Sequence, residues 1–343
     1  MVDQKMLAAL ETRQLRHAKK GLAFALFSGL LWAASGTALY LASSKNPFVQ
    51  PAEAVGLVIA AALSMAMIHD ASAAVLVFIF NVVTGKSKEL FRTLRTRPGK
   101  IVCLGAIMGG PVGMSGSLLG ITMAGSTYAM PITATYPALA AILSTFILKE
   151  KNPPRVWIGI LFCIAGALII GYTPVEETIN PNFKLGIALS CLATLGWATE
   201  GVVSTYGMDT LDPDVVLMIR ETVSTLVFAV AVLPALALSG IMGGIPGWTI
   251  ALDALTSPTI MAVVLAGCFG GTSYILWYRA LNSTGVARAM ALNICYAMWS
   301  VLLGVLLTDQ ELSFQSLAGA SFIVAGALLV VANPRELFSL RKV

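Results

Sequence analysis

Long apolar stretches recur along the whole chain and are separated by short polar breaks. Each stretch is continuous rather than alternating and is rich in Ala, Leu and Gly, so the pattern favours helices over strands. About 20 apolar residues are enough for a helix to cross a hydrocarbon core of about 30 Å. The pattern predicts ten membrane-spanning helices, at residues 21–42, 62–84, 101–122, 126–148, 156–173, 185–207, 214–238, 259–281, 285–308 and 314–333. Residues 52–68 are apolar too, so the second helix is overlong, tilted or preceded by a re-entrant segment.

The composition indicates an all-α membrane protein. Of its 343 residues, 57% are hydrophobic and 11% are charged, whereas a soluble domain has roughly 25% charged residues. A soluble core has no room to bury that much apolar surface.

Basic residues gather on one side of the predicted membrane. They are Lys5, Arg13, Arg16, Lys19, Lys20, Lys86, Lys88, Arg92, Arg95, Arg97, Lys100, Lys149, Lys151, Arg155, Arg279, Arg288, Arg335, Arg341 and Lys342. Only Lys45 and Lys184 fall on the other side, where the loop 174–183 is acidic. Because cytoplasmic loops are enriched in Lys and Arg, we expect both termini in the cytoplasm and the protein in the cytoplasmic (inner) membrane. The net charge of +5 then reflects orientation and lipid headgroup contact, and it does not indicate nucleic-acid binding.

The two halves of the chain resemble each other. At an offset of 165, Gly21, Trp32, Ala33 and Gly36 align with Gly186, Trp197, Ala198 and Gly201. At an offset of 160, Tyr136 aligns with Tyr296, and the segment GILFCIAGALII (159–170) aligns with GASFIVAGALLV (319–330). Matches in several blocks indicate an internal repeat.

Each half holds five predicted helices, and an odd number forces the halves to insert with opposite orientations. Such inverted repeats are typical of secondary transporters, whose substrate sites lie near the membrane midplane. We expect a basic tail at 1–20, a first repeat at 21–173, an extracytoplasmic linker at 174–184, a second repeat at 185–333 and a cytoplasmic tail at 334–343.

The Trp-centred first helix of each half, the Tyr of the fourth and ninth helices and the closing segment ELSFQSLAGASFIVAGALLVVANP (311–334) carry a family resemblance. They resemble the drug/metabolite transporter superfamily, and within it the EamA-type ten-helix permeases. The resemblance implies ten helices, a central cavity and transport of small metabolites. The chain departs from the family pattern in the long 45–61 segment and at the paired prolines Pro153 and Pro154.

Glu200 lies inside an apolar span, where a carboxylate is costly and usually marks a solute or ion path. Helical spacing places it on one stripe with Ala193, Trp197 and Ser204. The repeat relates this stripe to Ser28, Trp32 and Ser35, so Glu200 takes the place of Ser35. We therefore expect Trp197, Glu200, Trp32 and Ser35 at a substrate site; the alternative is a glutamate that only pairs with another helix.

Two further charged pairs, His69-Asp70 and Arg220-Glu221, lie in predicted spans. Neighbours on a helix do not face each other, so we expect one member of each pair to point inward. A coupling or gating role is one interpretation, with Arg220 pairing with Glu200 or Asp70. The other is that both pairs lie near the membrane interface.

Polar and aromatic residues at matching places in the halves extend the predicted substrate site. Tyr136 and Thr133 in the first half correspond to Tyr296 and Asn293 in the second, and Tyr274, Trp277 and Tyr278 form an aromatic group in the eighth span. Of these residues, Tyr136, Asn293, Tyr296 and Tyr274 are expected at the substrate site, and packing or anchoring at the membrane interface is the alternative for the aromatic ones. Pro131 and Pro137 are expected to kink the fourth helix. The glycine-rich runs at 105–116 and 267–271 indicate close helix contacts.

Other functional classes find little support. His17 and His69 are the only histidines, which excludes a multi-His metal site, and no cofactor is expected. The five cysteines have no CxxC spacing and are expected to pack. The segment VGMSGS (112–117) resembles the serine motif of intramembrane proteases, with His69 as a conceivable base, so an intramembrane serine hydrolase remains an alternative. A passive channel is another.

The residues of the predicted site favour an amine-bearing solute, either an amino acid or an organic cation. A desolvated carboxylate among aromatic rings suits an ammonium group through ion pairing and cation–π attraction. The same surroundings favour a neutral carboxyl, which fits exchange against protons. If Arg220 points inward it favours a zwitterion, while sugars and sugar phosphates fit less well. The expected partners are thus a small solute, membrane lipid and protons.

Overall fold

The computed structural model describes residues 4–51, 54–124, 129, 132–172, 182–239, 246–307 and 312–331, and all regular structure in these ranges is helical. Within the described ranges, seven helical segments are long and apolar enough to cross a membrane. They are Arg16–Ser43, Val55–Val83, Arg97–Ile121, Phe183–Gly207, Pro213–Leu238, Ile260–Thr284 and Val286–Leu307. Three shorter apolar helices accompany them: Tyr136–Ile147, Pro154–Ile170 and Phe314–Val330.

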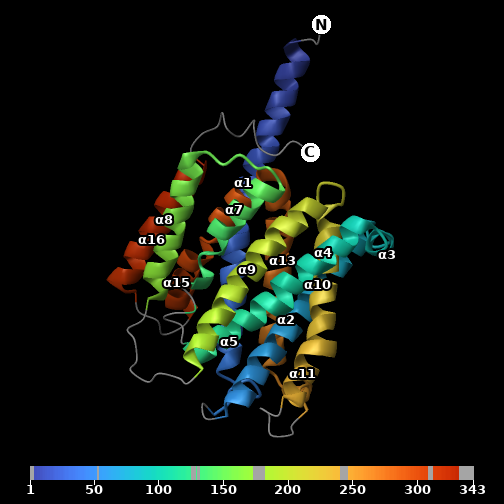
Figure 1. Ribbon diagram of the computed structural model, residues 1–343, viewed down its shortest axis with the longest axis vertical. Coiled ribbons are helices and arrows are strands. Elements are labelled where there is room, and N and C mark those ends of the chain that lie inside the picture. Colours follow the sequence, from blue (N-terminus) through green and yellow to red (C-terminus); the bar gives the residue numbers. More distant parts are fainter. Residues whose placement is uncertain are drawn as a thin grey trace.

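The long helices stand side by side as a bundle, and the start of α1 (Gln4–Ser43) projects beyond it at one end (Figure 1). The second helix, α2 (Val55–Val83), is one continuous helix of 29 residues, which fits the overlong alternative and shows no re-entrant break within residues 55–68. A short helix, α3 (Glu89–Leu94), follows it. Next, α4 (Arg97–Ile107) runs through the π-helical segment η1 (Met108–Met114) into α5 (Ser115–Ala124).

The second half begins with α9 (Phe183–Gly207). Then α10 (Pro213–Val227) continues through the π-helical segment η2 (Phe228–Val232) into α11 (Leu233–Leu238). A short α12 (Thr249–Thr256) precedes α13 (Ile260–Thr284).

Two predicted spans are shorter or interrupted in the structure. The prediction of one kinked helix over 126–148 is corrected in part: Pro137 is the second residue of α7 (Tyr136–Ile147), so this proline lies at the start of a helix and does not bend one. Pro131 lies outside the described residues. The predicted helix 285–308 is two helices, α14 (Val286–Asn293) and α15 (Tyr296–Leu307), separated at Ile294 and Cys295.

One pair of helices packs beside the main bundle. Helix α8 (Pro154–Gly171) lies along α16 (Phe314–Val331) (Figure 1). Their glycines leave no room for side chains: a Cβ at Gly159 would lie 2.8 Å from the Gly326 carbonyl oxygen, and one at Gly166 would lie 2.5 Å from that of Gly319. Small residues of this kind let membrane helices approach closely.

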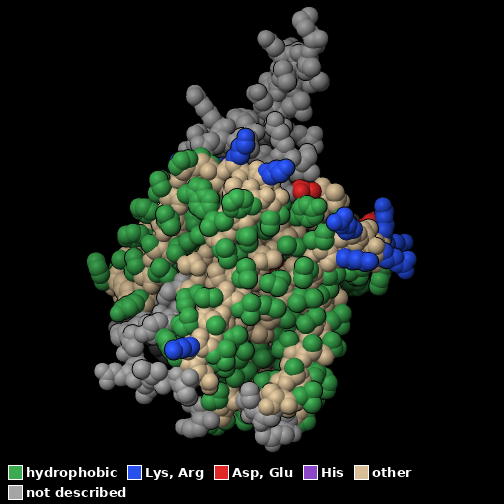
Figure 2. Space-filling view, viewed as in Figure 1, with side chains coloured by type: hydrophobic (Ala, Val, Ile, Leu, Met, Phe, Trp, Pro, Cys, Tyr) green, Lys and Arg blue, Asp and Glu red, His purple; other side chains and the backbone are tan. Residues whose placement is uncertain are grey.

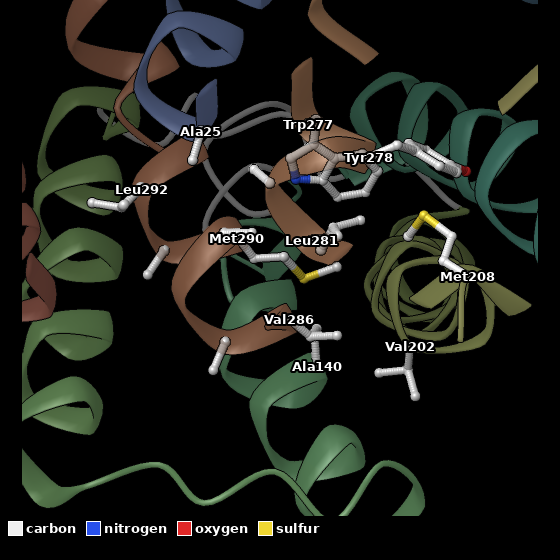
Figure 3. Close-up of a cluster of buried hydrophobic side chains, with 14 of the residues drawn as sticks. Ala25, Ala140, Val202, Met208, Trp277, Tyr278, Leu281, Val286, Met290 and Leu292 are labelled. Carbon is white, nitrogen blue, oxygen red and sulfur yellow. The ribbon is translucent and has the colours of Figure 1, made fainter. Parts of the chain in front are cut away.

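The core of the main bundle is built largely by α10, α13 and α14, with α9 packed beside them. Trp277, Tyr278 and Leu281 of α13 lie in one cluster with Val202 of α9 and Met290 of α14 (Figure 3). Apolar side chains also cover much of the outer surface between the two ends (Figure 2). An apolar exterior of this extent is expected of a protein whose solvent is lipid.

Candidate functional site

A cavity of about 80 Å³ lies at the centre of the bundle. That space is enough for several water molecules or one small solute. Its walls come from α1, α7, α9, α13 and the α14–α15 break, and they consist of Trp32, Tyr136, Trp197, Glu200, Ser273, Tyr274, Trp277, Asn293 and Tyr296.

Aromatic rings form most of this wall and brace one another. Trp32 meets Tyr274 edge-on, with ring centroids 5.2 Å apart, and Tyr136 meets Trp197 at 6.0 Å. Tyr274 in turn lies 6.0 Å from Trp277. Edge-to-face pairs at these distances are favourable, so the rings have defined orientations around the cavity.

The helix breaks supply the polar part of the wall. Asn293 is the last residue of α14, Tyr296 is the first of α15, and Tyr136 is the first of α7. The Asn293 amide nitrogen donates to the Ser28 hydroxyl at 2.6 Å, and the Ser273 hydroxyl donates to the Ser28 carbonyl oxygen at 2.7 Å. These bonds hold α13 and α14 against α1 beside the cavity.

Glu200 is 2% exposed and is the one acidic residue among the described residues that line the cavity. Its Oε1 accepts hydrogen bonds from Arg220 Nε at 2.8 Å and from the Tyr278 hydroxyl at 3.0 Å. Tyr278 also contacts the Ser204 hydroxyl at 3.2 Å. Both interpretations of Glu200 thus have a structural basis, because it faces the cavity and also pairs with another helix.

Arg220 lies behind the cavity wall and contacts three carboxylates. Besides Glu200, its Nη1 is 3.0 Å from Glu221 Oε2 and 3.5 Å from Asp70 Oδ2. Its Nη2 donates to the Tyr274 hydroxyl at 3.0 Å. With every group ionised, one guanidinium faces three carboxylates, which leaves a formal charge of −2 in a site where each of these groups is at most 2% exposed.

A hydrogen-bonded chain continues from Asp70 across α2. The Ser224 hydroxyl donates to Asp70 Oδ2 at 2.6 Å, and Asp70 Oδ1 lies 2.9 Å from His69 Nδ1. His69 Nε2 then lies 3.1 Å from the Ser35 hydroxyl. Polar groups of α10, α2 and α1 are thereby joined in one buried network.

The expectation that only one member of each charged pair points inward is wrong. His69, Asp70, Arg220 and Glu221 are all buried, and neighbours contact each other directly within each pair. The spacing rule for helix faces assumes one face toward solvent or lipid. Helices α2 and α10 are enclosed by protein at this level, so adjacent side chains both meet buried partners.

Comparison with known proteins accounts for this architecture. The sequence profile of the EamA-like transporter family matches residues 19–172 and, a second time, residues 184–332. The chain belongs to the EamA-like transporter family.

Two curated proteins and one solved structure are similar to most of this chain. Protein LicB of Haemophilus influenzae is 30% identical over 315 residues, covering 91% of this chain and 97% of its own. An uncharacterized transporter of Archaeoglobus fulgidus is 25% identical over 62% of this chain and 70% of its own. A chain of known crystal structure superposes with a TM-score of 0.70 at 19% identity, covering 93% of this chain and 99% of that one, which shows the shared fold.

Glycines of η1 and α13 let these segments pack closely against the helices that carry the buried polar network in this EamA-like chain. A Cβ at Gly109 or Gly110 of η1 would collide with Glu200 or Ser224, and one at Gly270 of α13 would collide with His69. The Gly109 carbonyl oxygen also accepts from Trp197 Nε1 at 3.1 Å. The prediction that both glycine-rich runs mark close helix contacts is confirmed by this packing.

The sequence-predicted residues lie in two adjoining places. Seven of the eight predicted substrate-site residues line the cavity, and the eighth, Ser35, lies in the hydrogen-bonded chain instead. Trp277 and Ser273 line the cavity although they were not assigned to it; the aromatic cluster of the eighth span was the available signal for Trp277. The serine-hydrolase arrangement does not form among the described residues, since His69 contacts Ser35 and Asp70, and the Ser115 hydroxyl has no hydrogen-bond partner there.

Proposed function

We propose that this chain is a secondary transporter that moves a small organic cation through the central cavity by alternating access. The seven long helices and three shorter ones then make ten membrane passes in two inverted repeats of five. The two matches to the family profile, which fall on either side of residues 173–183, support this organisation.

The observation that carries the proposal is the chemistry of the cavity wall. Six of its nine residues are aromatic, and Glu200 is its charged group. Aromatic faces attract a desolvated cation by up to about 2 kcal/mol or more each. A substituted ammonium group suits such a wall because it carries charge but needs few hydrogen-bond acceptors.

The position of Arg220 favours a cation over a zwitterion. Its Nε and both terminal nitrogens are directed at Glu200, Glu221, Asp70 and Tyr274, and it does not line the cavity. None of the described residues lining the cavity is basic. A solute carboxylate would therefore lack a countercharge there, which argues against the amino-acid alternative.

The excess of acidic groups supports exchange against protons. Burying unpaired charge is costly, and the three carboxylates around Arg220 exceed its single charge by two. A bound cation or bound protons can each offset that excess. Competition between them at Glu200 would couple solute movement in one direction to proton movement in the other.

A panel of solutes tests the proposed substrate class. Thermal unfolding of the purified protein should shift upward most with tetramethylammonium, less with methylammonium, and not with alanine, glucose or glucose 6-phosphate, because a ligand that binds the folded state stabilises it. Proteoliposome uptake of the same solutes should follow this order and proceed uphill when a proton gradient is imposed. Uptake confined to the phosphorylated solute contradicts the charge argument, and purely downhill movement indicates the channel alternative.

Labelling of single cysteines tests the inverted topology. With the five native cysteines replaced, a cysteine at exposed Ser44 should react with an impermeant maleimide from outside whole cells, and one at exposed Arg95 should react only after permeabilisation. These residues lie at opposite ends of α2, so one pass separates them. External labelling at position 95 overturns the orientation and, with it, the cytoplasmic placement of the termini.

A further inference from the structure

The basic segment around α3 is the most strongly charged patch of the described surface outside the central site. Within residues 88–100, the exposed cations are Lys88, Arg92, Arg95, Arg97 and Lys100. Glu89 is the only acidic residue within residues 88–100. Its contact with Arg92 is long, at 3.5 Å, and the side chains of Arg92 and Glu89 are 79% and 49% exposed. Figure 2 shows these Lys and Arg side chains gathered over α3 at the edge of the molecule.

The segment is fixed in place, so the patch has a defined shape. Leu90 and Thr93 are buried on the inner face of α3, which packs on α4 and α10. A Cβ at Gly99 would collide with the Thr93 carbonyl, and Thr96 caps α4 by accepting from Gly99 N at 3.1 Å. Lys88, Arg92 and Arg95 are left on the outer face.

The position of α3 relates the patch to lipid. It projects sideways from the bundle near the end where α2 finishes (Figure 1). Shortly before α3 in the sequence, the last turns of α2 expose Phe78, Ile79 and Val83, and the Val83 side chain is 81% exposed. The exposed side chain on α3 itself that is not charged is Phe91, at 71%. An aromatic ring among cations, next to an apolar helix surface, is the pattern of a segment lying at the headgroup level of a bilayer.

We propose that Phe91 and Arg92 on the outer face of α3, together with the flanking Lys88 and Arg95 and with Lys100 of α4, bind anionic phospholipid headgroups of the surrounding membrane. The cations pair with headgroup phosphates, and Phe91 inserts at the boundary of the acyl chains. Charge complementarity decides the occupant, because juxtamembrane clusters of four or more Lys and Arg attract anionic lipid. The site is separate from the solute cavity, and the inference does not depend on which solute is carried.

The test compares two variants that lose equal charge from the full-length protein. The first is Lys88→Gln, Arg92→Gln, Arg95→Gln and Lys100→Gln; the control is Lys45→Gln, Lys149→Gln, Lys151→Gln and Lys184→Gln, all at exposed positions. Thermal unfolding is measured in detergent micelles with phosphatidylglycerol or with phosphatidylcholine added. We expect phosphatidylglycerol to raise the melting temperature of the wild type and the control, and the rise in the α3 variant to fall by at least half. Equal rises in both variants overturn the proposal.

Two further measurements separate headgroup binding from simpler explanations. Glycerol 3-phosphate at the same concentration should not reproduce the rise, since it lacks the acyl chains; if it does, the site binds free phosphate and not lipid. If the fourfold variant does not fold, two smaller variants test the same lipid site. One is the double variant Arg92→Gln/Arg95→Gln, and the other is Phe91→Ser, which leaves the charge unchanged. Both should retain less phosphatidylglycerol than the wild type in native mass spectra, and unchanged retention in both contradicts the proposal.

Discussion

Glu200→Gln is expected to lower kcat/KM for the organic cation proposed as the solute at least tenfold while leaving a folded, inserted protein. The substitution removes the charged group of the cavity wall, and a loss of about 1.4 kcal/mol in solute attraction already corresponds to a factor of ten. The fold should survive because Arg220 keeps Glu221 and Asp70 as partners. The cost to stability should therefore stay below the roughly 3–5 kcal/mol of breaking an isolated buried pair.

Glu221→Gln provides the matched control for this result. Glu221 is also a buried partner of Arg220, at 3.0 Å, but it does not line the cavity. Its substitution removes the same charge from the network, so solute binding measured by thermal shift should stay within a few-fold of the wild type. If both variants lose binding equally, Glu200 acts only as a partner of Arg220, and the cavity-wall role assigned to it is wrong. Unchanged transport by Glu200→Gln across a range of pH has the same consequence.

Hydropathy predicted the helices well where each one is a single continuous element. Spans such as 185–207 and 259–281 agree with α9 and α13 to within about three residues at each end. The span 285–308 agrees with the apolar segment Val286–Leu307, but hydropathy missed the interruption inside it, because Ile294 and Cys295 are as apolar as the helices they separate. The break lies between Asn293 and Tyr296, which both line the cavity. Which residues line a cavity depends on how the helices pack, and local hydropathy does not report on that packing.

The site was predictable in part because buried charge is rare in an apolar chain. Glu200, Arg220 and Asp70 could be selected from the sequence on that ground alone. The repeat then located Trp32 and Tyr296 by alignment with Trp197 and Tyr136. What could not be predicted is the partner of each group, since the contacts between α2, α9 and α10 depend on how closely their backbones approach. Ser35 shows this limit, because the alignment places it opposite Glu200 while the fold directs it to His69.

A second ion network lies at the end of the bundle where α2 finishes, α10 begins and α13 finishes. Asp214 is 3% exposed and receives a two-bond contact from Arg279, with Nε and Nη2 both at 2.9 Å. Lys86 donates to the same carboxylate at 2.6 Å and to Asp212 at 2.7 Å. The Asn81 amide donates to the Asp214 carbonyl oxygen at 3.1 Å. One carboxylate thereby joins a loop of the first half to two helices of the second.

The Lys86 contacts in this second network should not change with pH near neutrality. Burial lowers the pKa of Lys86, but its hydrogen bonds to Asp212 and Asp214 and their charges outweigh this effect, so its pKa lies above the ordinary value of 10.5. A raised pKa means that the stabilisation by Lys86 is fully present below that ordinary value and is lost only as the pH rises through the raised one. The Lys86 contacts are therefore constant near neutral pH. A pH dependence of transport between about pH 6 and 8 should therefore not arise from the Lys86 contacts.

Asp214→Asn should open this end of the bundle. In the proposed alternating-access cycle this end must separate once per turnover, and the Asp214 carboxylate ties α10 to Arg279 of α13 and to Lys86 in the loop after α2. Asparagine leaves Arg279 without a carboxylate, and Lys86 keeps only Asp212. The expected loss of stability is about 2 kcal/mol, below the 3–5 kcal/mol of a fully buried pair, because solvent screens the two cations, whose side chains are 35% and 32% exposed.

Hydrogen exchange of amides at 208–220 should quicken at least tenfold, and Lys86→Gln, which spares the Arg279 contact, should have a smaller effect. Unchanged exchange together with unchanged transport in Asp214→Asn would show that the network does not hold this end closed.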